Sequence, residues 1–387
     1  MHRTGVLVLL TAICWAVRLT PDVLAAEPAP PEPPKTLEDQ LKYLEGAVAE
    51  ALRGEDWKML ELTADGIAKA GISAEAREIL VSHGERQAAL EMMSGMSTGP
   101  EKRARVETWG LALRAMLGDK PSREQLRTMA QTAPPAPKPP EPAGAGATPS
   151  VGGLSGGSRW VLDPGAMLTA WRQQNALVCL ALLKEAGVVE MALACVKQPA
   201  AATRGMTWYG GAGLDRVPSP AALAALLSDP AAGWKALTAF LADREADGFA
   251  KVAVFNTLNS AQRLLADPKA MEQRPFSLVA QLKPKLPDTA RKELDDLYIV
   301  QVKACDGKDL NLVGTLAGAA YQLDLTEEAK AALTELKGRL TGQNAQHMQT
   351  VVDRAIAGRR RPSAAPAAPP GQPVKPPPPP PPPPDGF

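Results

Sequence analysis

The sequence predicts an all-α protein, and three observations support this prediction. Apolar residues make up 45% of the chain but aromatic residues only 4%, and alanine, the strongest helix former, is abundant throughout, whereas strands favour aromatic and β-branched residues. Apolar residues recur at helical spacing, and no window alternates as a half-buried strand does. We therefore expect antiparallel helical hairpins in two domains, with a solenoid-like stack as one arrangement that such hairpins adopt.

The N-terminus resembles a secretory signal peptide. Arg3 precedes an apolar run from Gly5 to Val17, and small residues follow at Val23–Ala26. The run is too short for a transmembrane helix, which needs about 20 residues. We expect cleavage of 1–26 and an exported protein, periplasmic or secreted, without a transmembrane segment in the mature chain. The alternative is a helix that anchors the chain in a membrane.

Proline marks the boundaries between the ordered regions. Of 38 prolines, 26 fall in three short segments that are also poor in large apolar residues. Such segments bury too little surface to offset the entropy of ordering. We expect the following organisation: signal peptide 1–26, proline-rich linker 27–35, helical domain 36–132, disordered Pro/Gly/Ala-rich linker 133–158, helical domain 159–358, and disordered basic and polyproline tail 359–387.

The first region contains a series of helices with short connections. We expect helices over 56–70, 74–94, 100–117 and 122–131 in addition to one that starts near Thr36. Ser73 and Ser122 are the expected N-caps of the second and fourth of these helices, because a serine hydroxyl accepts a hydrogen bond from a free N–H of the first turn.

The second region repeats one signal for a helix start. A capping residue stands directly before a proline at residues 163–164, 219–220, 229–230 and 267–268. The side chain of the capping residue accepts a hydrogen bond from a free N–H of the first turn. Proline is tolerated in the first turn because its missing N–H would have no partner within the helix. Further helices are expected over 288–304, 309–323, 326–340 and 343–358.

Two stretches resemble hairpins of the tetratricopeptide repeat family. In 312–337 the resemblance comes from Ala317-Gly318-Ala319-Ala320-Tyr321, followed by Ala329, Leu333 and Leu336; in 176–197 it comes from Ala181–Gly187 and Glu190–Leu193. The spacing from Tyr321 to Ala329 is one residue shorter than in that family, and glycine occupies the position of its tryptophan at residue 314. The resemblance implies stacked hairpins with a surface that binds other chains.

The search for catalytic chemistry is largely negative. The sequence lacks a zinc-protease His-Glu-x-x-His, a phosphate-binding loop, a Gly-x-Ser-x-Gly elbow and paired cysteines with zinc spacing. We therefore predict no cofactor, no metal site and no catalytic residue. With 43 basic and 42 acidic residues, no net charge favours nucleic acid as a partner.

One long segment, 199–218, has no helical periodicity. It places Trp208 and Tyr209 among glycines, beside the charged residues Arg204, Asp215 and Arg216. Long loops inside compact regions often bind ligands, and aromatic side chains stack on sugars or clamp peptides. These five residues are the candidate binding site. The alternative is a surface loop whose Trp208 packs into the core.

The cysteines allow one disulfide bond after export. Cys179 and Cys195 lie at equal distances on either side of Gly187, so a turn there would place them at similar heights on two antiparallel helices. The alternative is that both are buried as small apolar side chains.

Together these features predict an exported helical scaffold or protein-interaction module, more consistent with a binding protein than with an enzyme. Its expected partner is an envelope or extracellular protein, or a polysaccharide. The alternative is a cell-surface polymer hydrolase or carbohydrate-binding protein with a groove near 199–218. The proline run 376–384 forms either a spacer or a polyproline ligand for another domain.

Overall fold

The computed structural model describes residues 36–53, 56–93, 100–135, 164–198, 219–266, 282, 286–320, 323, 325–342 and 344–358. These residues form fourteen α-helices and no strand, so the all-α prediction is confirmed for this part of the chain. The helices are α2 Leu37–Arg53, α3 Trp57–Lys69, α4 Ala74–Met93, α5 Pro100–Met116, α6 Lys120–Gln131, α7 Pro164–Leu182, α8 Val188–Val196, α9 Pro220–Ser228, α10 Pro230–Ala242, α11 Gly248–Ala266, α13 Ala290–Ala304, α14 Leu310–Ala320, α15 Glu327–Arg339 and α16 Ala345–Ala357.

Most of the expected helix starts are found where local chemistry placed them. Helices α7, α9 and α10 begin at the prolines of three cap–proline pairs, and the fourth pair, at 267–268, lies outside the described residues. The hydroxyl of Ser73 accepts a hydrogen bond from the N–H of Ala76 at 3.1 Å, as an N-cap does.

The expected cap of α6 was wrong. This helix begins at Lys120, and its N-cap is Asp119, whose carboxylate accepts from the backbone N–H of Ser122 at 3.0 Å. The hydroxyl of Ser122 also donates to this carboxylate. A carboxylate at the cap position is a strong acceptor and interacts favourably with the helix dipole.

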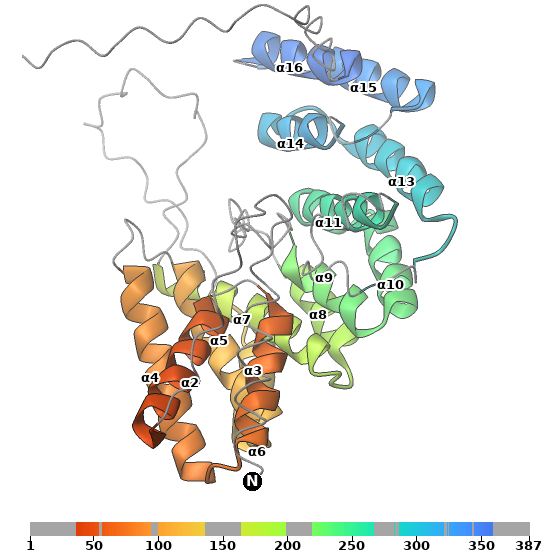
Figure 1. The fold of residues 1–387 in the computed structure, drawn as a ribbon. Coiled ribbons are helices and arrows are strands. Elements are labelled where there is room, and N and C mark those ends of the chain that lie inside the picture. The colour runs from red at the N-terminus through yellow and green to blue at the C-terminus, as the bar shows by residue number, and fades with distance from the viewer. Residues whose placement is uncertain are drawn as a thin grey trace, which may run out of the picture.

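The helices α2–α6 form one group (Figure 1), and two buried tryptophans pack against each other within it. Trp57 of α3 and Trp109 of α5 meet edge to face, with ring centroids 5.7 Å apart. Helix α4 packs closely on α2: a Cβ at Gly84 would lie 2.3 Å from Cγ1 of Val48, so only glycine fits at this contact.

Helix α7 joins the two regions that the sequence separates at 133–158. It packs on α5 and α6 on one side and on α9 on the other, and every residue from Ala176 to Leu182 is buried. Buried residues from Leu44 to Ala355 form one contiguous hydrophobic cluster. The two predicted regions therefore share a core in this structure.

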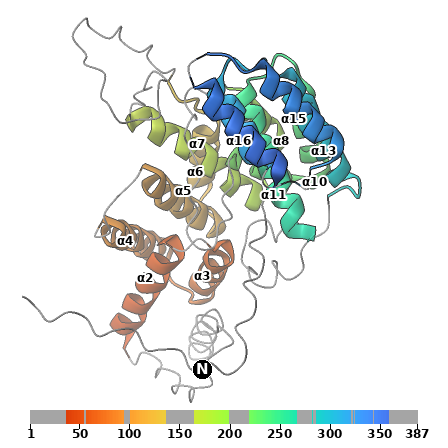
Figure 2. The ribbon, with the colours of Figure 1, turned by 90° about the horizontal axis from the view of Figure 1, so that it is seen from above.

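The remaining helices are stacked on one another. Helix α11 packs on α13 and α14, while α13 packs on α15 and α14 on α16. Figure 1 shows the pairs α13–α14 and α15–α16 as successive layers beyond α11, and Figure 2 views this stack from its end. In the stretch 312–337, α14 thus packs mainly on α11 and α16, and α15 on α13 and α16. In the stretch 176–197, α7 and α8 are joined by a turn at Gly187.

Candidate functional site

The predicted binding residues lie outside the described part of the chain. Arg204, Trp208, Tyr209, Asp215 and Arg216 all belong to 199–218. The structure instead describes the two helices that precede and follow this segment. Helix α8 ends at Val196, helix α9 begins at Pro220, and the two helices pack on each other.

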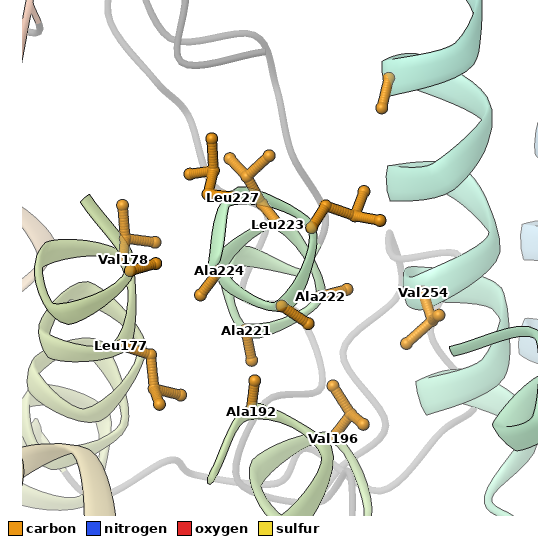
Figure 3. Packing of buried hydrophobic residues seen from close by; sticks show 14 of the residues in the cluster. Leu177, Val178, Ala192, Val196, Ala221, Ala222, Leu223, Ala224, Leu227 and Val254 are labelled. Carbon is orange, nitrogen blue, oxygen red and sulfur yellow. The ribbon is translucent and has the colours of Figure 1, made fainter. Parts of the chain in front are cut away.

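Helix α9 is surrounded by other helices. Its residues from Pro220 to Leu227 are all buried. Figure 3 shows it end-on, with Ala221 toward Ala192 of α8 and Ala222 toward the helix that carries Val254. Small side chains allow this close packing, and α10 also approaches, since a Cβ at Gly233 would lie 2.5 Å from the carbonyl oxygen of Ala225. The helix that follows the segment 199–218 in the sequence is therefore tightly packed.

The first residue after this segment is bonded to α11. The backbone N–H of Ser219 donates to Oγ1 of Thr257 at 3.0 Å, and its Oγ accepts from the N–H of Ala222 at 3.3 Å. The Thr257 hydroxyl in turn donates to the carbonyl of Ala253 at 2.9 Å. These bonds fix the beginning of α9 to the middle of α11.

Helix α11 carries a row of amide side chains beside this anchor, which we call the amide row: Asn256, Asn259 and Gln262. The three residues are spaced three apart in the sequence, so each lies about one helical turn from the next on the helix surface. Asn259 is fully buried, and neither its Oδ1 nor its Nδ2 has a hydrogen-bond partner. Oδ1 of Asn256 and Oε1 of Gln262 are also buried and unpaired, although both side chains are otherwise half-buried.

The amide row is costly for the fold. Each buried polar atom without a partner costs about 1–3 kcal/mol, while a whole domain is stable by about 5–15 kcal/mol. Packing alone would favour leucine or methionine at these positions. Within the described residues, Asn175 on α7 presents a similar case, with Nδ2 buried and unpaired.

The first turn of α11 holds a buried lysine next to an acidic connection. Lys251 is 8% exposed, and burial lowers its pKa, while Asp243, Asp247 and Glu245 raise it. Asp247 caps the helix by accepting from the N–H of Ala250 at 2.9 Å, and Asp243 and Glu245 are exposed. Asp247 thus caps the start of α11, and the negative charge of the three carboxylates offsets the cost of burying Lys251.

Two carboxylates that converge elsewhere are bound to one arginine. The guanidinium of Arg114 on α5 donates to Glu78 at 2.7 and 2.9 Å and to Glu85 at 2.6 and 3.0 Å, both on α4. The hydrogen bonds from Arg114 lower the pKa of Glu78. A general acid needs a raised pKa, so this group is suited to joining α4 and α5.

The three described cysteines are free thiols. The turn that a disulfide bond would need is present, with Gly187 at φ 77°. However, Sγ of Cys179 points to α5 and donates to the carbonyl oxygen of Thr108 at 3.8 Å. Burial raises the pKa of Cys179 and of Cys195 to about 12. The structure therefore has no bond between Cys179 and Cys195, and Cys179 packs as a small buried side chain.

The described helices contain neither a cluster of metal ligands nor a helix that could span a membrane. No three His, Cys, Asp or Glu side chains in this part of the chain are grouped so that they could hold a metal ion. The two described histidines, His83 and His347, are exposed. No described helix combines the length and the apolarity that are needed to cross a bilayer.

The chain matches no protein-family model, no curated protein and no solved structure. The resemblance to tetratricopeptide hairpins therefore rests on the residues quoted above. The amide row was not found from the sequence, although three amides at regular spacing in one helix are a usable signal.

Proposed function

We propose that this protein is an exported helical scaffold that binds another protein of the envelope or the extracellular space. The observation that supports this best is the packing of the two helices that flank the segment 199–218 in the sequence. The segment lies in the sequence between α8 and α9, two helices that pack on each other. The residue that follows it, Ser219, is bonded to Thr257 of α11. A long segment on a rigid helical base is a common design for recognition.

The carboxylate pairs of the described part favour a binding protein over a hydrolase. Glu78 and Glu85 share Arg114, and Glu185 pairs with Arg123 at 2.8 Å and with Arg127 at 2.5 Å. These carboxylates are occupied in holding helices together.

Photo-crosslinking in the producing cells tests this proposal. A photoreactive amino acid replaces Tyr209 in one variant and the exposed Lys235 of α10 in a matched control. We expect the Tyr209 variant to form a specific adduct with one protein and the Lys235 variant to form none. Equal adducts from both positions would contradict the proposal, as would release of soluble sugar from purified cell-surface polymer by the wild-type protein.

Export is tested separately by the intact mass of the processed protein. We expect a chain that begins after residue 25 or 26, because Val23-x-Ala25 and Leu24-x-Ala26 supply the small residues of a cleavage site. A chain that still begins at Met1 would contradict export through this signal.

A further inference from the structure

We draw no further inference here: the strongest candidate, the surface patch on the outer face of α4 where Ile79 and Leu90 are exposed three helical turns apart, carries none because nothing in the described part of the chain shows what covers it.

Discussion

Arg172 on α7 donates to Glu107 on α5 at 2.9 Å, across 65 residues of sequence that include the predicted linker. A second contact of this kind joins Glu185, just after α7, to Arg127 of α6. Both contacts accompany the packing of α7 on α5 and α6. The linker thus connects two groups of helices that are already held to each other.

Cleavage of the linker should therefore leave the two fragments associated. A specific protease site inserted after Gly146 would be cut to completion, and we expect both fragments to elute together in size-exclusion chromatography. Burial of the apolar face of α7 supplies most of the free energy of association. The ion pairs help to fix the orientation of α7 on α5 and α6. Fragments that separate at low ionic strength without denaturant would contradict the shared core. Arg172→Met should weaken the association of the cut protein.

Arg114→Met should destabilise the fold by about 1–3 kcal/mol. The substitution leaves Glu78 and Glu85 without the guanidinium that both of them share, and a carboxylate that loses a buried partner is costly. The effect is smaller than for a fully buried pair because Glu78 is 56% exposed. Urea unfolding measures the change. Lys58→Met breaks an exposed pair with Glu61 and should change the free energy of unfolding by less than about 0.5 kcal/mol.

Two glycine substitutions should have opposite signs. Gly233→Ala places a Cβ 2.5 Å from the Ala225 carbonyl oxygen, and the overpacking should cost about 1–3 kcal/mol. Gly318→Ala on α14 meets no atom within 4 Å, and alanine should stabilise that helix by about 0.5–1 kcal/mol. Thermal unfolding of the two variants measures both changes in stability. Equal effects of the two would contradict the close contact of α9 and α10.

Acidification should weaken the contact between α10 and α13. The carboxylate of Glu293 accepts from Nε1 of Trp234 at 2.7 Å, and hydrogen bonds from Thr289 and then Trp234 lower its pKa below the ordinary value of 4.5. A lowered pKa in the folded state gives stability that is present above the ordinary value and is lost as the pH falls through the folded value. Urea midpoints should therefore fall less steeply below pH 4.5 in Glu293→Gln than in the wild type. Identical pH profiles would show that the carboxylate contributes no such stability.

The cysteines should behave as three separate thiols. In the folded protein at pH 8, Cys179 should resist alkylation, because it is fully buried and its pKa is raised to about 12. In urea without reductant, peptide-level mass spectrometry should find Cys179, Cys195 and Cys305 all labelled. A pair that becomes reactive only after reduction would contradict the free thiols of the structure.

Local chemistry made some elements predictable from the sequence. The cap–proline pairs predict the starts of α7, α9 and α10 because cap and proline act within a single turn. The start of α6 was misplaced because Ser122 and Asp119 both have side chains that cap helices. Sequence alone does not show that the carboxylate of Asp119 would accept from Ser122 itself.

Contacts between distant residues were not predictable in the same way. The burial of Asn259 depends on the helices that surround α11, which no local pattern encodes. The packing of α14 on α16 likewise departs from the hairpin that the spacing of 312–337 suggests. The orientation of Cys179 toward Thr108 depends on α5, a helix that precedes the linker. The candidate residues of 199–218 remain a prediction.

The complete burial of α7 between Ala176 and Leu182 has a consequence for the nascent chain. The helices up to Gln131 leave the ribosome before α7 is made, and at about 5–20 residues per second the delay is roughly 3–10 s. During that interval the apolar side of α5 and α6 that will receive α7 is uncovered. A chaperone that shields apolar surface would act most usefully in this interval, and slow codons between 132 and 164 would prolong the exposure.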